Sequence, residues 1–286
     1  MTAPPSDKTC QTRPLEASDL GAVRALLASA RGPATYIGND LAQEAGRKRL
    51  ARQALGVFGR RGLSAVCWFG GRSNLLVTVA PGAVVDADLL AETLDAHGEY
   101  WRIALGPPAV LAALAAVAPT RTRILRTQIF CEVEHEHEVA SVARSMRGAV
   151  RADLAWLVMA AAELNRTDLG LRPDDVSERW LRDAARARLS AGSTFVVGPR
   201  GAPLAKLDLG SVGPAGVVIE GVFTDPRARG QGVGAGLVAA VCQRELRGGA
   251  RYVTLHVDRD NAAARACYAR AGMREVSESG LLLREA

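Results

Sequence analysis

Residues 222–236 read Val-Phe-Thr-Asp-Pro-Arg-Ala-Arg-Gly-Gln-Gly-Val-Gly-Ala-Gly. They continue a β-prone run, Val217 to Thr224, and precede an amphipathic run, Leu237 to Leu246. This order predicts a strand, a glycine-rich turn and the N-terminus of a helix. Such a turn suits a phosphate group, because glycines allow close approach of the backbone and the first helical N–H groups have no partner within the helix.

Two common nucleotide motifs do not fit this turn. A dinucleotide fingerprint needs GxGxxG near the start of a long parallel series, whereas only about fifty residues follow this one, and the match Gly230-x-Gly232-x-x-Ala235 is imperfect. A Walker loop needs Lys-Ser or Lys-Thr after its glycines, and neither follows here.

A third pattern fits better and continues downstream. Arg229-x-x-Gly232-x-Gly234 is followed by a β-prone run, 252–257, and then by Asn261-x-x-Ala264-x-x-x-Tyr268-x-x-x-Gly272-Met273. In this order and spacing, the two motifs resemble the acetyl-CoA-binding signatures of the GNAT superfamily, the Gcn5-related N-acetyltransferases. The resemblance covers about residues 146–286, and the whole chain looks like actinobacterial GNAT proteins with an additional N-terminal domain of unknown function.

The resemblance implies an α/β (α+β) fold with a mixed, mostly antiparallel sheet, a splayed strand pair and flanking helices. We predict a catalytic domain at 146–286 and an N-terminal α/β domain at 1–145. The βα rhythm of the first half indicates a degenerate second GNAT-like fold. Because that half has no Arg-x-x-Gly-x-Gly motif, we assign it no cofactor.

The family likeness also implies which residues hold acetyl-CoA. Residues 222–224 would pair with the pantetheine arm between two diverging strands, and the amides of 230–235 would hold the pyrophosphate. The positions carried over from the family are Val222, Phe223, Thr224, Arg229, Gly230, Gln231, Gly232, Val233, Gly234, Ala235, Asn261 and Ala264. Ordinary structural roles stay open for two of them: Arg229 as a solvated loop residue and Asn261 as a helix cap.

The implied chemistry is attack of a neutral amine on a thioester carbonyl, with a backbone N–H near Val222 stabilising the oxyanion. Tyr268 matches the phenol that protonates the departing thiolate in many relatives. For the general base there are two candidates, His256 and Glu220, each with a purely structural role as the alternative. Cys242 and Cys267 are expected to be buried, which favours direct transfer in a ternary complex over a cysteine intermediate.

Composition limits the partners. The 286 residues carry a net charge of +6, but 33 of the 36 basic residues are arginine and they are spread along the chain, so we expect no nucleic-acid binding. No apolar run is long enough to cross a membrane, and five scattered cysteines (10, 67, 131, 242 and 267) suggest a reduced, cytoplasmic location. His135 and His137 allow a metal site, but a solvated strand end is the preferred interpretation, so we predict no metal.

The sequence therefore predicts an acetyl-CoA-dependent N-acetyltransferase acting on a primary amine of a small molecule or a protein. The alternatives are a non-catalytic acyl-CoA sensor or interaction protein, and an acetyltransferase resembling mycothiol synthase, which also has two such folds. The acceptor depends on residues around 165–178 and on the N-terminal half, and it is left open, as is the oligomeric state.

Overall fold

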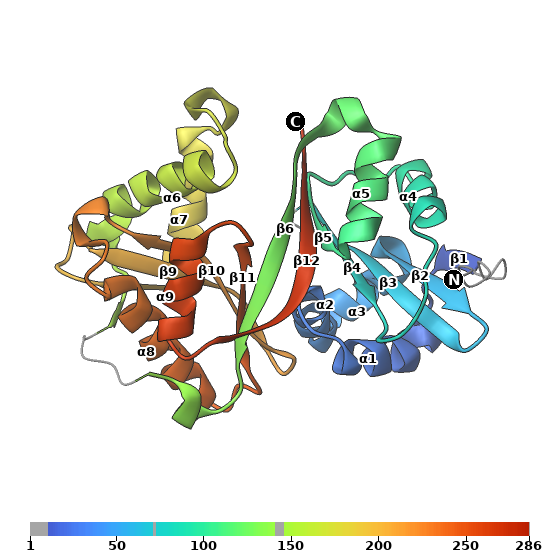
Figure 1. Cartoon of the computed structure of the whole chain (residues 1–286), viewed down its shortest axis with the longest axis horizontal. Helices are drawn as coiled ribbons and strands as arrows, with labels where there is room; N and C mark the ends of the chain where they lie inside the picture. Colours follow the sequence, from blue (N-terminus) through green and yellow to red (C-terminus); the bar gives the residue numbers. More distant parts are fainter. Residues whose placement is uncertain (1–10, 71–72, 141–145, 286) are drawn as a thin grey trace. The chain divides into compact units, whose positions relative to one another are not determined.

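The computed structural model describes residues 11–70, 73–140 and 146–285, and the chain divides into two units (Figure 1). Unit 1 comprises Met1–Phe130, Gly213–Ala215 and Val276–Ala286, and unit 2 comprises Cys131–Val212 and Gly216–Glu275. The boundary predicted between residues 145 and 146 adjoins 141–145, which lies outside the described residues, as does Cys10; the boundary stays a prediction.

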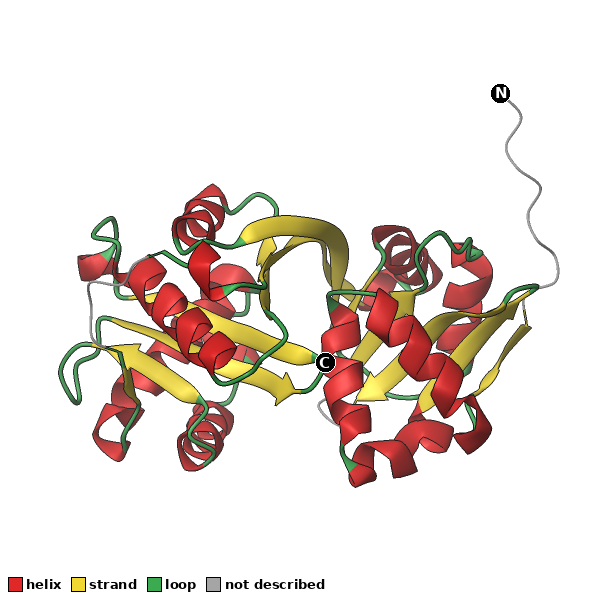
Figure 2. Cartoon of the chain, turned by 90° about the horizontal axis from the view of Figure 1, so that it is seen from below, coloured by secondary structure: helices red, strands yellow, loops and turns green. Residues whose placement is uncertain are grey.

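Unit 1 is a mixed sheet with helices beside its strands (Figure 2). Its strands are β1 (Gln11–Pro14), β2 (Ala54–Gly59), β3 (Gly62–Gly70), β4 (Asn74–Val79), β5 (Ile103–Gly106), most of β6 (Thr122–Val133) and most of β12 (Arg274–Arg284). Its helices are α1 (Leu20–Ser29), α2 (Pro33–Ala42), α3 (Glu44–Gln53), α4 (Ala87–Ala96) and α5 (Pro108–Val117). The strand order is β1-β2-β3-β4-β5-β12-β6, with β4 and β5 parallel and β12 antiparallel to β5.

Unit 2 repeats this plan. Its strands are β7 (Arg147–Gly148), β8 (Thr194–Val197), β9 (Ala205–Gly213), β10 (Gly216–Thr224) and β11 (Val253–Asp258), and its helices are α6 (Leu154–Asp168), α7 (Glu178–Ser190), α8 (Val233–Arg247) and α9 (Ala262–Arg270). From the end of β6 the strand order is β6-β11-β10-β9-β8-β7. As in unit 1, one neighbouring pair is parallel, β10 with β11, and a helix connects its strands.

The opening turn of each unit contains the same arginine–aspartate ion pair. In unit 1, Arg13 donates hydrogen bonds of 2.7 and 2.8 Å to Asp19, which also accepts from the N–H of Glu16. In unit 2, Arg147 donates bonds of 2.7 and 3.0 Å to Asp153, which accepts from the N–H of Val150. The same spacing precedes α1 and α6, so the two units are variants of one fold.

Helical periodicity and capping explain where α8 and α7 of unit 2 form. In α8, the buried residues Val233, Leu237, Val238 and Val241 lie on one face, as a period of 3.6 requires. The helix begins at Val233, four residues before the apolar run that predicted it. Ser177 caps α7, accepting a hydrogen bond from the N–H of Trp180.

In the part of the chain that the structure describes, none of the helices has the length and apolar character needed to span a bilayer.

Candidate functional site

The parallel strands β10 and β11 separate soon after they meet. Their register pairs Val217 with Val253 and Val218 with Thr254, although β10 continues to Thr224 and β11 to Asp258. This is the predicted splay. Where the two strands diverge, their edges leave backbone groups for an amide-containing chain, as in strand addition to a sheet edge.

A bend in β10 decides which side chains face which helices. Gly221 has φ +55°, so successive residues there do not alternate as in a regular strand. Phe223 contacts Trp156 of α6, with ring centroids 5.7 Å apart. Thr224 faces the other way, toward α8, since its Oγ1 lies 2.6 Å from where a Cβ on Gly234 would be.

The turn between β10 and α8 has room for a ligand. Gly230 and Gly232 both have φ +74°, and a Cβ on either would meet nothing within 4 Å. Gly232 is the N-cap of α8 and provides no side-chain cap, so the first N–H groups of the helix lack the acceptor that most N-caps supply. The backbone thus fits a diphosphate.

Neighbouring side chains fix the shape of this turn. Asp225 accepts hydrogen bonds from the backbone N–H of Arg227 at 2.9 Å and from its guanidinium at 2.9 and 2.7 Å, and these bonds hold the pKa of that carboxyl well below its usual value. Arg229 donates to the carbonyl of Thr224 at 3.2 Å. Gln231 donates to the carbonyl of Arg227 at 3.0 Å, so both Arg229 and Gln231 extend along the turn that the sequence assigned to phosphate.

The second signature forms the start and middle of α9. Asn261 is its N-cap and accepts a 3.0 Å hydrogen bond from the N–H of Ala264, which is the structural role that the sequence left open. Tyr268 lies farther along and is 7% exposed. Burial raises the pKa of its phenol well above the usual value, with smaller contributions from Cys267 and Asp168, so the side chain stays neutral.

Both predicted bases lie half-buried on strands, Glu220 on β10 and His256 on β11. The register pairs Val218 with Thr254, and side chains two positions farther along each strand return to the same face. Glu220 and His256 therefore share a face of the sheet.

Glu220 also borders a charged cluster that the sequence did not reveal. Its carboxylate lies 3.7 Å from the guanidinium of Arg188, which contacts Asp208 at 3.0 Å. Asp208 in turn pairs with buried Lys206 at 2.5 Å. The scarcity of lysine is the one sequence signal that singles out this cluster, because Lys206 is one of only three lysines.

The cysteines of unit 2 are poor nucleophiles. Burial raises the pKa of Cys242 to about 12 and that of Cys131 to about 11. Cys267, beside Tyr268, also has its pKa raised by burial. Burial therefore disfavours the thiolate, the form that reacts as a nucleophile, at these three positions.

The corresponding helix of unit 1 has a different N-terminus. Asp86 caps α4, and its carboxylate accepts a 3.1 Å hydrogen bond from the N–H of Leu89. The negative charge of this carboxylate disfavours a second anion at the same helix end. The neighbouring strands are also close, since a Cβ on Gly106 would lie 3.1 Å from the carbonyl oxygen of Val77.

The segment around His135 and His137 is used for structure. The two rings stack, with centroids 5.4 Å apart. Glu138 accepts hydrogen bonds from the backbone N–H groups of Glu134 and His135, and Glu136 pairs with Arg247 of α8.

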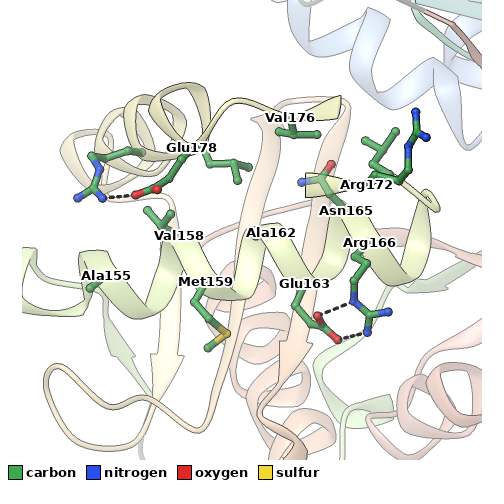
Figure 3. Close-up of a pocket in the computed structure, with 13 residues that line it drawn as sticks. Ala155, Val158, Met159, Ala162, Glu163, Asn165, Arg166, Arg172, Val176 and Glu178 are labelled. Carbon is green, nitrogen blue, oxygen red and sulfur yellow. Dashed lines mark hydrogen bonds and ion pairs between the residues drawn. The ribbon is translucent and has the colours of Figure 1, made fainter. Parts of the chain in front are cut away.

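A pocket of about 630 Å³ lies between α6, α7 and their connection (Figure 3). Met159 and Ala162 line it from α6, whereas Trp156 of the same helix points to the sheet and contacts Phe223. Its rim carries the ion pairs Glu163–Arg166 and Glu178–Arg182. None of the residues assigned to acetyl-CoA or to proton transfer lines it, but the stretch around 165–178, on which the acceptor was expected to depend, contributes Asn165, Arg166, Leu171, Arg172, Val176 and Glu178.

Comparison with known proteins agrees with this geometry. Residues 159–273 match the Acetyltransferase (GNAT) family. This part of the chain is a GNAT acetyltransferase domain. The matched range of the GNAT domain includes the splayed strands, the glycine turn, α8 and Tyr268. No curated protein is detectably similar to the chain in sequence.

Solved GNAT structures resemble nearly the whole chain. A GCN5-related N-acetyltransferase from Sphaerobacter thermophilus has 18% identity and a TM-score of 0.60, over 96% of this chain and 95% of that one. A GNAT-family acetyltransferase from Colwellia psychrerythraea has 14% identity and a TM-score of 0.54, over 97% and 100%. A tandem GNAT protein from the clavulanic acid biosynthesis pathway has 16% identity and a TM-score of 0.50, over 97% and 99%.

At these identities the likenesses show the fold. The predicted fold class is confirmed: a mixed GNAT sheet flanked by helices, with a GNAT-like N-terminal region. Family and fold together support a general acyl-CoA-dependent acetyltransferase, a family whose members typically use acetyl-CoA.

Proposed function

We propose that the protein is an acetyl-CoA-dependent N-acetyltransferase that acetylates a primary amine by direct attack in a ternary complex. The observation that carries this proposal is the divergence of β10 and β11 beside a helix whose N-cap, Gly232, has no side chain. Together these features suit a ligand with an amide-containing arm and a diphosphate.

The residues assigned to the donor are those of the splay and the turn. Backbone groups of 222–224 would pair with the pantetheine arm, and N–H groups of 230–235 would hold the diphosphate, with Asn261 and Ala264 at the start of α9 beside the arm. When bound, acetyl-CoA supplies an activated acetyl thioester. The chain's part is to orient it and to hold the N–H of Val222 ready for developing negative charge.

Two kinds of side chain would move protons. Tyr268, buried and neutral, is the proton donor for the departing thiolate. Glu220 or His256 would accept the proton of the attacking amine from their common face of the sheet. The raised pKa values of the buried cysteines favour direct transfer over an acetylated cysteine.

The test is release of coenzyme A with a panel of primary amines, comparing the intact chain with Tyr268→Phe. We expect kcat to fall about 100-fold in the variant, with affinity for acetyl-CoA unchanged, because the lost hydroxyl acts only on the proton. Cys267→Ala is the matched control and keeps its activity. Tight binding without turnover for any amine would instead support the sensor function.

A further inference from the structure

Four charged side chains meet where β9, β10 and α7 come together in unit 2. Lys206 and Asp208 are 3% and 1% exposed, and their side chains are joined by a 2.5 Å hydrogen bond. Asp208 also accepts from the hydroxyl of Thr194 at 2.6 Å and pairs with Arg188 at 3.0 Å. Three donors therefore converge on the carboxylate of Asp208.

The lysine is an unusual choice in this chain. The sequence has 33 arginines and three lysines, and the other two, Lys8 and Lys48, are remote from this cluster in sequence. Burial disfavours its charged form and lowers the pKa of Lys206, an effect that Asp208 offsets in part. A buried pair of this kind is weak evidence for stability, since apolar residues of similar volume often serve as well. A role beyond stability is the better explanation.

The cluster adjoins the bend of β10. Gly221 has φ +55°, and a Cβ built on it would lie 2.9 Å from the carboxylate of Asp208 and 3.2 Å from the ammonium of Lys206. The backbone of Gly221 thus lies directly against the ion pair, in a conformation that other residues rarely adopt.

The same pair is linked to Glu220 through Arg188. One guanidinium nitrogen of Arg188 contacts Asp208 at 3.0 Å, and another lies 3.7 Å from the carboxylate of Glu220. The cluster thus contains two basic side chains and two acidic ones. Without Lys206, the buried carboxylate of Asp208 would draw Arg188 to itself and away from Glu220.

We propose that the Lys206–Asp208 pair is a positioning device for acetyl transfer: it holds the bend of β10 at Gly221, and with it the carboxylate of Glu220 and the N–H of Val222. This inference rests on the proposed function of β10. Neither Lys206 nor Asp208 touches the reactants, and they act through the backbone and through Arg188.

The experiment replaces both members of the pair, Lys206→Met with Asp208→Leu, because an apolar pair of similar size leaves no buried charge unpaired. We expect kcat to fall about 30- to 100-fold while the Kd for coenzyme A changes less than about threefold, since misplacement of a reacting group affects the transition state most. Lys206→Arg keeps the charge and restores at least about a third of kcat.

A second pair provides the control for lost stability. Arg147 and Asp153, also partly or fully buried in unit 2, are bound to each other and to the loop at Gly201. Arg147 lies on β7, which β8 and β9 separate from β10 in the strand order, and neither residue contacts the charged cluster in the contacts of the described residues. Arg147→Met with Asp153→Leu is expected to lower Tm while leaving kcat unchanged at temperatures where the protein is folded. An equal loss of kcat in this control would overturn the positioning role, as would an unchanged kcat in the Lys206 variant.

Amide hydrogen exchange over 218–224 gives a readout that does not need turnover. We expect about tenfold faster exchange in the Lys206–Asp208 variant and no change there in the Arg147–Asp153 variant. If the intact chain acetylates no amine, the proposed function fails, but faster exchange at the bend still supports the positioning of β10. Unchanged exchange overturns it.

Discussion

Gly234 and Gly236 lie two positions apart in the first turns of α8, and they differ in what a methyl group would meet. A Cβ on Gly234 would lie 2.6 Å from Oγ1 of Thr224 and 3.4 Å from the sulfur of Cys267, whereas one on Gly236 would meet nothing within 4 Å. Gly234 therefore allows the N-terminus of the helix to approach β10 closely.

We expect Gly234→Ala to weaken coenzyme A binding about tenfold, because the added methyl must displace Thr224 or move α8 away from the strand. Gly236→Ala should leave affinity unchanged and stabilise the helix by about 0.5–1 kcal/mol, the usual gain of alanine over glycine. Calorimetric titration and thermal unfolding measure the two effects. Equal affinities for both variants would show that the close approach is unimportant.

The sequence predicted single residues well when their partners lie nearby along the chain. A helix-cap role was left open for Asn261, and its side chain accepts from the N–H of Ala264 three positions later. The network around Lys206 was not predicted, because Arg188, Thr194 and Glu220 come from other elements and only the sheet brings them together. No local pattern encodes such a contact.

At the level of secondary-structure elements, the two units differ in how the N-terminus of the corresponding helix is capped. Gly232 begins α8 without a side-chain cap, whereas Asp86 supplies a carboxylate to α4. The first N–H groups of α8 thus have no side-chain acceptor, whereas one at the start of α4 bonds to a carboxylate. That residues 1–145 hold no cofactor stays a prediction from the sequence.

Replacing Gly232 by aspartate places a carboxylate at the start of α8, as Asp86 does at the start of α4. We expect Gly232→Asp to weaken coenzyme A binding about tenfold more than Gly232→Asn, since both side chains tolerate the positive φ and only one opposes a diphosphate. Titrations at low and high salt measure the effect, and the gap should narrow as salt screens the charge. Identical affinities for the two variants would argue against a diphosphate at this helix.

Elements with one clear period were predicted within a few residues. The β-prone run Val217 to Thr224 lies in β10, and the amphipathic run Leu237 to Leu246 lies in α8. β12 was not predicted from the sequence, because glutamates, serines and arginines surround its three leucines. Its β character depends on pairing with β5, a strand about 170 positions earlier, and no local periodicity records that pairing.

The order of strands assigns the end of the chain to unit 1. Residues Gly280 to Leu283 of β12 pair with β5, and Leu282 is part of the apolar core of that unit. Ser279 donates a 2.9 Å hydrogen bond to the carbonyl of Gly106, and Arg284 lies over the ring of Trp101. Unit 1 therefore includes a strand that lies about 170 positions after β5 in the sequence.

Leu282→Ala should accordingly destabilise unit 1, although the residue belongs to the segment that follows the GNAT domain. Leu282 is fully buried, and the loss is expected to be about 2–5 kcal/mol, as for other leucines removed from a close-packed core. Urea unfolding measures it, with faster hydrogen exchange in 54–79 as the local readout. Glu278→Ala, on the exposed part of the same strand, is the control and should change neither. If exchange in 54–79 is unaffected by Leu282→Ala, the first unit folds without the strand, and the pairing of β12 with β5 contributes little to its stability.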